Sequence, residues 1–376
     1  MSDAEGSSTP SESEAAPDLH AHRFGASPPL SLGVEEELLL VDRHHAPVAA
    51  SDAVLDAVAA PFASRVSSEI FAEQIELKTA ICHASDDVLR QLRETRQAIR
   101  DAGFGLLGSG LHPAAASGEA KLVSQPRYEV VREDFGDLLS TPPCGLHVHV
   151  GMPDPETAVQ VANAFRVYLP VLQALTANSP FREGVDSGNA SSRASVVRSY
   201  PRFRLPRQFR DYEDFCRVAD QLIAAAGVDD YTYIWWDVRP HPRLGTVEVR
   251  AVDVQTDAAT STAVAALIQA IAAKELDRPS APGLYREAIE ESYFQAASHG
   301  LDADLLFDGD DPEPARAVAQ RVLESSRPYA RELGGDAALE EIERILREGN
   351  GADAQRRVHR EAGMPGLLDY LAEHTR

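Results

Sequence analysis

The sequence has few cysteines and no long hydrophobic run. Its three cysteines are Cys82, Cys144 and Cys216, and none belongs to a CxxC pair. An odd, scattered set argues against a disulfide framework, so we expect a reducing, cytoplasmic environment. No apolar run approaches the roughly 20 residues of a membrane-spanning helix, so we expect no membrane partner.

Several familiar catalytic motifs are also absent. The chain has no GxxxxGK[ST] phosphate loop, no GxGxxG between a strand and a helix, and no serine nucleophile elbow. These absences exclude the common loop-based nucleotide sites and hydrolases of the serine-elbow type. A nucleotide would therefore have to be held by metal ions and arginines on a sheet.

Positive charge is scarce as well, and the formal net charge is −23. Such a chain is a poor partner for nucleic acid. The 36 basic residues include only three lysines, at Lys78, Lys121 and Lys274. Cationic chemistry therefore depends on arginine, whose guanidinium matches carboxylate and phosphate groups.

Composition along the chain predicts one folded domain behind a polar tail. The start of the chain is rich in Ser, Glu, Ala and Pro and lacks the basic and apolar regions of a signal peptide. We expect residues 1–29 to form a disordered acidic tail. Residues 30–376 are expected to form a single catalytic domain, with a sheet-bearing part at 30–255 and a helical part at 256–376.

Alternation of polar and apolar residues predicts about six strands in the sheet-bearing part. We expect them at 30–41, 67–80, 104–111, 144–151, 231–239 and 245–254. The short connection between the last two favours an antiparallel pair. Beyond residue 256 the pattern predicts helices only. Together these features predict an α+β fold, with helices on one face of an antiparallel sheet and a polar opposite face.

Four of the predicted strands carry polar residues two positions apart, which places each pair on one face of its strand. Such faces indicate that one side of the sheet lines a wet cavity. Carboxylates with an occasional imidazole suit Mg²⁺ or Mn²⁺, whereas two histidines with one carboxylate would also suit zinc or iron. The pattern alone leaves both open. The pairs are Glu35 with Glu37, Gln74 with Glu76, His147 with His149, and Glu248 with Arg250.

Six segments that follow one another along the chain carry a family resemblance. They are GVEEEL at 33–38, QIELKT at 74–79, CGLHVHVG at 144–151, ANSPF at 177–181 with its continuation to Arg193, WDVRP at 236–240, and TVEVRAVD at 246–253. In this order they resemble the glutamate–cysteine ligase type 2 family of carboxylate–amine ligases. The resemblance implies a glutamine-synthetase-like sheet that forms a funnel. It also implies ATP-dependent joining of the glutamate side-chain carboxylate to the amine of cysteine through an acyl phosphate.

The resemblance further implies roles for individual residues. Divalent cations, Mg²⁺ or Mn²⁺, would clamp the ATP phosphates. Their ligands would be Glu35, Glu37, Glu76, His147, His149 and Glu248. Arg250, with Arg193 or Arg239, would neutralise the transferred phosphoryl group or the substrate carboxylate. Expected nucleotide contacts are Gln74, Trp236, Asn178 and Ser179. The expected partners are small-molecule substrates, and a homo-oligomer is compatible with the sequence.

Three other functions stay open at this point. A kinase acting on a guanidino or amine group could use the same scaffold, and it would release a phosphorylated amine. A metal-dependent oxygenase could use His147, His149 and one glutamate. A non-catalytic relative would bind Mg-ATP without releasing ADP.

Overall fold

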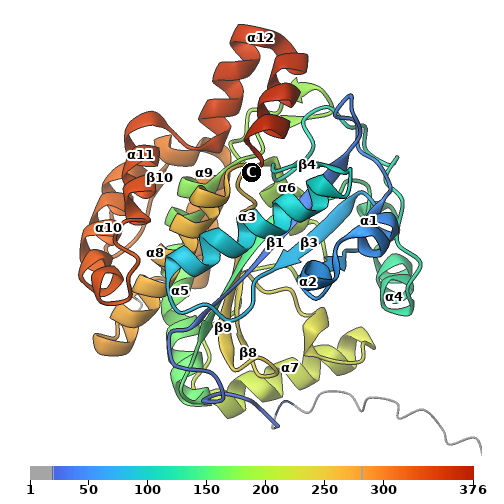
Figure 1. The fold of residues 1–376 in the computed structure, drawn as a ribbon. Coiled ribbons are helices and arrows are strands. Elements are labelled where there is room, and N and C mark those ends of the chain that lie inside the picture. The colour runs from blue at the N-terminus through green and yellow to red at the C-terminus, as the bar shows by residue number, and fades with distance from the viewer. Residues whose placement is uncertain (1–18, 20, 281–282) are drawn as a thin grey trace, which may run out of the picture.

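The computed structural model describes residues 19, 21–280 and 283–376, and it has an α+β architecture (Figure 1). Seven strands form one antiparallel sheet in the order β2-β3-β1-β5-β9-β8, and β4 pairs with the end of β1. The predicted fold class is confirmed. The strands of this sheet are β1 (Leu32–Val41), β2 (Val66–Ser68), β3 (Gln74–Lys78), β4 (Gly105–Leu107), β5 (Gly145–Gly151), β8 (Val238–His241) and β9 (Thr246–Asp253).

Two short hairpins lie outside this sheet. One pairs β6 (Phe181–Arg182) with β7 (Val185–Asp186), and the other pairs β10 (Asp304–Leu305) with β11 (Glu313–Pro314).

Helices make up most of the remaining chain, and from residue 258 onward they dominate it. They are α1 (Ser51–Ala57), α2 (Ala60–Ala63), α3 (Ser85–Asp101), α4 (Pro126–Phe135), α5 (Pro155–Thr176), α6 (Ser192–Arg198), α7 (Tyr212–Ala226), α8 (Ala258–Asp277), α9 (Arg286–His299), α10 (Ala315–Glu332), α11 (Leu339–Glu348) and α12 (Gly351–His374), with 3-10 turns η1 (Gly136–Leu138), η2 (Tyr231–Tyr233) and η3 (Gly300–Asp302). Within the described residues, none of these helices combines the length and apolar character needed to cross a bilayer.

The helices cover one face of the sheet in two layers. Helices α3, α5 and α8 pack directly on the strands, and α9, α10 and α11 pack on α5 and α8 from outside (Figure 1). The start of α5 follows from its sequence, because the Asp154 carboxylate accepts a hydrogen bond from Thr157 N at 2.8 Å and Pro155 occupies the first turn. The opposite face of the sheet is left free for polar side chains.

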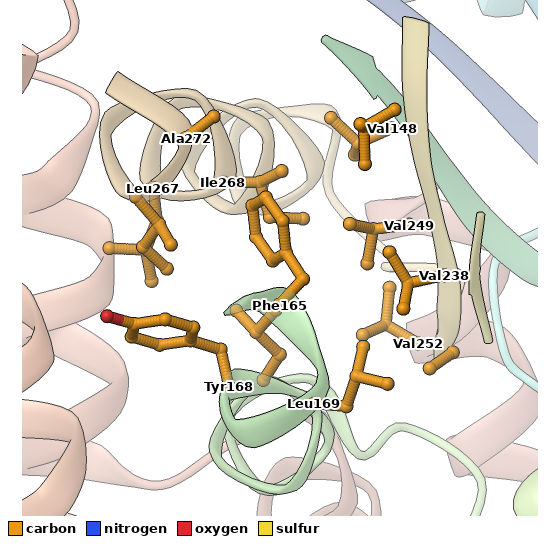
Figure 2. Packing of buried hydrophobic residues seen from close by; sticks show 14 of the residues in the cluster. Val148, Phe165, Tyr168, Leu169, Val238, Val249, Val252, Leu267, Ile268 and Ala272 are labelled. Carbon is orange, nitrogen blue, oxygen red and sulfur yellow. The ribbon is translucent and has the colours of Figure 1, made fainter. Parts of the chain in front are cut away.

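The hydrophobic core lies between the sheet and the α5–α8 layer. Figure 2 shows Phe165 and Leu169 of α5 directed at valines of β5, β8 and β9, with Ile268 of α8 closing the space. Burying an apolar side chain of this size stabilises the folded state by about 1.5–3 kcal/mol compared with leaving it exposed to water. This core fixes which face of each strand is apolar, and it thereby fixes the polar face as well.

A β-bulge in β9 changes the alternation near the end of that strand. Leu146 pairs with Val252 and Val148 pairs with Val249, so β9 contains one residue more than β5 between these pairs. As a result Val249 and Val252 both face the core (Figure 2). Asp253 is consequently placed on the same face as Glu248.

Three of the predicted strands have different boundaries, and the one predicted at 104–111 is reduced to β4 at Gly105–Leu107. The stretch 67–80 is a hairpin of β2 and β3, since the chain turns at residues 69–73 and buries Phe71 completely. The stretch 231–239 begins with η2, because the Asp230 carboxylate accepts a hydrogen bond from Thr232 N at 2.6 Å and starts a turn. Only Val238 and Arg239 of that stretch belong to β8.

The tail predicted at residues 1–29 falls mostly outside the described residues. Of the part that is described, Leu19 and Phe24 are buried in the main core, and Gly25 N donates to the carbonyl of Met152 at 2.9 Å. Packed chain therefore extends upstream of residue 30.

Candidate active site

Neighbouring strands bring the predicted polar pairs into one cross-strand patch. Glu37 pairs with Glu76 across β1 and β3, and Glu35 pairs with His147 across β1 and β5. His149 pairs with Glu248 across β5 and β9, and Glu248 pairs with Arg239 of β8. Residues separated by more than 200 positions in the chain thus meet because of strand register alone.

The centre of this patch has the geometry of a cation site. Glu35, His147 and Glu248 each offer a ligand atom, and these atoms lie within 4.8 Å of one another. His149 Nε2 lies 3.7 Å from Glu35 Oε2 and 3.8 Å from Glu248 Oε1. That nitrogen is buried and has no hydrogen-bond partner within the described chain, whereas Nδ1 of the same ring lies 3.0 Å from Thr246 Oγ1. An oriented imidazole with an unused nitrogen beside two carboxylates fits a divalent cation.

A second group of carboxylates lies beside this centre. Glu37 accepts a hydrogen bond from Gly145 N at 2.5 Å, and its Oε1 lies 3.7 Å from His147 Nε2. Glu76 lies 2.7 Å from both Lys78 Nζ and Ser67 Oγ. Burial, followed by the charge of Glu35, raises the pKa of Glu76. Of these two carboxylates, only Glu76 has a lysine or arginine as an ion-pair partner among the described residues. A bound cation would reduce the repulsion between the carboxylates.

The pKa values of the central carboxylates shift in the opposite direction from that of Glu76. Burial opposes ionisation of Glu248, but the charges of Arg239 and Arg250 hold its pKa well below the usual value. Burial likewise opposes ionisation of Glu35, and the neighbouring imidazoles of His147 and His149 outweigh it and hold the pKa of Glu35 well below the usual value. Both groups are therefore anionic and able to bind a cation near neutral pH.

Two of the three predicted arginines are held by Glu248. Arg239 Nε lies 2.7 Å from Glu248 Oε2, and Arg250 Nη1 donates to Glu248 Oε1. The guanidinium of Arg239 is anchored further by the carbonyls of Tyr231 and Ile234. Arg239 thus orients Glu248, and Arg250 keeps its Nε without a hydrogen-bond partner in the described residues.

Arg193 differs from the other two because its guanidinium makes no hydrogen bond within the described residues. It lies in the first turn of α6 and is 1% exposed, and its Nε and Nη1 have no hydrogen-bond partner among the described residues. Its nearest counter-charge is Asp253, at 3.9 Å from Nη1. Gly145 makes room for it, since a Cβ at this position would lie 2.3 Å from Nη2. A buried guanidinium at a cavity wall, with one acid at 3.9 Å and no hydrogen bond of its own, is suited to an anionic ligand.

A cavity of about 330 Å³ opens onto this patch. Polar residues of the sheet form one end, and an apolar cluster from α4, α6 and the following loop forms the other. The polar lining includes Glu37, Gln74, Glu76, Lys78, His147, Arg193, Arg239 and Arg250. The sheet and this cavity form the expected funnel.

Three of the residues expected to contact nucleotide do not reach this cavity. Trp236 packs in the core, with its ring centroid 5.3 Å from that of Phe209. Asn178 donates its side-chain amide to the carbonyl of Val254 at 2.8 Å, and Ser179 donates to Asp253 at 2.7 Å. Trp235 lines the cavity instead of Trp236, because residues 234–237 precede β8 and strand alternation does not apply to them. The fourth residue, Gln74, lines the cavity and donates to the Pro143 carbonyl.

Glu69 was not identified from the sequence, yet it lines the cavity between Ser68 and Ile70. Burial and the charges of Glu76 and Glu37 raise its pKa well above the usual value. It lies in the turn between β2 and β3, so no alternating pattern could have identified it. A carboxyl group of raised pKa in a cavity is a candidate proton acceptor.

Glu36, the middle residue of the three-glutamate run, faces the opposite side of β1. Its carboxylate pairs with Arg96 of α3 through two bonds of 2.7 and 2.9 Å, and both side chains are fully buried. Arg96 also donates to the carbonyls of Gln255 and Thr256. This pair joins β1, α3 and the start of α8 beneath the site.

Comparisons with known proteins find similar sequences over most of the chain. A model of glutamate-cysteine ligase family 2 (GCS2) matches residues 31–369. A Rubrobacter xylanophilus protein that carries the provisional name glutamate–cysteine ligase 2-3 is 41% identical over 363 residues. The alignment covers 94% of this chain and 99% of the relative. The Haloferax volcanii glutamate–cysteine ligase is 35% identical over 354 residues, covering 91% of this chain and 96% of its own.

Solved structures show the same fold. The chain superposes on a glutamate–cysteine ligase from Francisella tularensis, crystallised in complex with AMP, with a TM-score of 0.67. The two sequences are 14% identical, and the match covers 92% of this chain and 88% of the other.

Proposed function

Because this chain belongs to glutamate–cysteine ligase family 2, we propose that it is an ATP-dependent carboxylate–amine ligase. The observation that carries the proposal is the meeting of Glu35, His147 and Glu248 within 4.8 Å beside a cavity that His147 and Arg193 line, where Nε and Nη1 of Arg193 have no hydrogen-bond partner. Such a site combines cation ligands with an anion-binding group.

The proposed donor is the side-chain carboxylate of glutamate. A carboxylate is a poor electrophile, and transfer of the γ-phosphoryl group of ATP converts it to an acyl phosphate. The amine of the acceptor, for which the family is named cysteine, then attacks the carbonyl carbon. A C–N bond forms, the C–O bond to phosphate breaks, and phosphate leaves with the electron pair.

Cation ligands would come from four neighbouring strands, β3, β1, β5 and β9. Glu35, Glu37 and Glu76 would hold Mg²⁺ or Mn²⁺ together with the imidazoles of β5 and Glu248 of β9. When bound, the cations would neutralise the phosphate oxygens of ATP. Arg239 keeps Glu248 oriented through its 2.7 Å ion pair.

The two remaining arginines would each bind a different anionic group of the substrates. Arg250, at the polar end and still carrying a free Nε, would offset charge on the transferred phosphoryl group. Arg193 would bind the α-carboxylate of glutamate, since its Nε and Nη1 have no hydrogen-bond partner among the described residues. Asp253 and the space above Gly145 position it for that contact.

Glu69 is the proposed base of the second step. The acceptor amine arrives as an ammonium ion and must lose a proton before or during attack. Glu69 lies at the cavity wall, and its raised pKa makes it a better proton acceptor than an ordinary carboxylate.

ADP release tests the proposal directly. Purified protein would be incubated with ATP, glutamate and a panel of amines, with Mg²⁺ or Mn²⁺, and products would be identified by mass spectrometry. We expect ADP, phosphate and a γ-glutamyl amide in equal amounts. ADP with a stable phosphorylated amine would instead identify a kinase, and oxygen uptake without ATP would identify an oxygenase.

A further inference from the structure

Arg127 is the one basic residue of the cavity wall that has no acidic partner within the described chain. The other basic residues of the wall each lie within 4.0 Å of a carboxylate, namely Lys78, Arg193, Arg239 and Arg250. Arg127 instead donates from Nη1 to Thr232 Oγ1 at 2.9 Å, and its Cζ lies 4.4 Å from the centroid of the Tyr233 ring. Its positive charge is therefore available to an anionic ligand.

The guanidinium of Arg127 can still form a paired contact with a carboxylate. A guanidinium presents several N–H donors in a planar fork that matches the two oxygens of a carboxylate. Within the described chain, Arg127 uses its donors only on the hydroxyl and the carbonyl of Thr232. The side chain is exposed at the cavity mouth, so a substrate can reach it from solvent.

Arg127 begins a stripe of α4 that faces the cavity. Val131 and Phe135 follow it one and two helical turns later, and all three residues line the cavity. Since each helical residue adds about 1.5 Å of rise, neighbouring members of this stripe are roughly 6 Å apart. Trp235 meets Phe135 edge to face with ring centroids 5.5 Å apart and extends the apolar part. A cation and an apolar surface thus lie within the reach of one small amino acid.

Glu69, the proposed base, lies next to the first turn of α4. Tyr128 donates its hydroxyl to the Ser68 carbonyl at 3.2 Å, which joins this turn to the end of β2. Burial, followed by the charge of Glu69, raises the pKa of the Tyr128 hydroxyl, as expected for a nearby carboxyl group. A proton acceptor and the guanidinium of Arg127 therefore flank the same part of the cavity.

We propose that Arg127 binds the carboxylate of the acceptor amino acid. The proposal rests on the proposed ligase function and assigns a residue to its second substrate. The amino group of the acceptor faces Glu69, and its side chain lies against Val131 and Phe135. The amino nitrogen forms the C–N bond as the C–O bond to phosphate breaks, and its proton passes to Glu69. Donor and acceptor carboxylates thus use different arginines, since Arg193 holds that of glutamate.

Pairs of acceptors that differ only by the carboxylate test this role. The pairs are cysteine with cysteamine and 2-aminobutyrate with propylamine. ADP release at saturating ATP and glutamate gives kcat/KM for each acceptor, and mass spectrometry identifies the γ-glutamyl product. We expect the unmodified protein to prefer the amino acid in each pair, and Arg127→Met to reduce that preference about tenfold or more. The loss should fall on the amino acid, with kcat/KM for the matching amine within about threefold of the original.

Two further variants separate the fork of Arg127 from its charge and its place on α4. Arg127→Lys keeps the charge without the planar fork, so its preference should lie between those of the unmodified protein and Arg127→Met. Arg132→Met removes the same charge from an exposed position of α4 that does not line the cavity, and it should leave the preference unchanged. Melting temperatures and KM for glutamate, measured in parallel, should be near those of the unmodified protein in all three variants.

Three results would overturn the proposal, and they differ in what else they affect. If Arg127 only joined α4 to η2, Arg127→Met would weaken amino acids and amines alike, and the preference would stay unchanged. Equal kcat/KM for the members of each pair in the unmodified protein would also refute the role of Arg127 while supporting the ligase function. Absence of ADP with every acceptor, in both metals, would refute the ligase function as well.

Discussion

Gly145→Ala tests the role of Arg193, because it adds one methyl group beneath the guanidinium. The added Cβ would lie 2.3 Å from Nη2 and 3.0 Å from Cζ of Arg193, and a less severe 3.2 Å from His147 Nε2. An ordinary contact needs about 3.5 Å, so the guanidinium would have to retreat by roughly 1 Å. Gly145 has no positive φ, so alanine causes no backbone strain at this position.

The expected magnitude follows from that displacement. Misplacing a substrate-binding group by about 1 Å can reduce the rate on the order of 100-fold, which corresponds to about 2.7 kcal/mol of transition-state stabilisation. We therefore expect Gly145→Ala to lower kcat/KM for glutamate about 100-fold. The melting temperature should remain within a few degrees, since replacing a strand glycine by alanine restricts the unfolded chain.

The assay is ADP release at varied glutamate concentration, with thermal denaturation run in parallel. Gly33→Ala is the matched control, because it lies on neighbouring β1 and its Cβ would meet only His149 Cβ at 3.5 Å, an ordinary contact. We expect near-normal kinetics for the control. Equal kcat/KM in the two variants would refute the assignment of Arg193 as the carboxylate-binding group.

Three further changes probe the metal site and the core. Glu37→Gln should stay folded, because an amide oxygen can still accept from Gly145 N, but ADP release should fall about 100-fold or more; normal turnover would remove Glu37 from the ligand set. Thr246→Val removes the hydrogen bond that orients His149, so the Mg²⁺ or Mn²⁺ concentration for half-maximal activity should rise about tenfold, and an unaltered metal titration would argue against His149 as a ligand. Arg96→Met leaves the Glu36 carboxylate buried and unpaired, so the free energy of unfolding, measured by urea denaturation, should fall by about 3–5 kcal/mol. Arg90→Met, at an exposed position of the same helix, is the control and should lower it by less than about 1 kcal/mol.

Strand alternation predicted much of the site from sequence. Glu35, Glu37, Glu76, His147, His149, Glu248 and Arg250 were identified because each lies on a regular strand whose other face is apolar. The α+β class and the mostly helical C-terminal part followed from the same kind of pattern, but the β10–β11 hairpin corrects the prediction that this part contains helices only.

The rest depends on irregular backbone that a two-residue period does not describe. The bulge in β9 places Asp253 beside Arg193, and the turn after β2 brings Glu69 to the cavity. Trp235 was missed in favour of Trp236 because the segment before β8 is not a strand. In each case tertiary packing, and not local alternation, decides where the side chain lies.

Glu36 and its two neighbours also lock the alignment of β1 with the strands beside it. A slip of one position would turn the carboxylates of Glu35 and Glu37 toward the interior, where Arg96 is positioned to receive a single acid. The same slip would move Glu36 onto the open face and leave that arginine without its partner. The three consecutive acids therefore make misaligned strand pairings less stable during folding. Replacing Glu36 with an apolar residue should make the alignment of β1 less specific, even though Glu35 and Glu37 are unchanged.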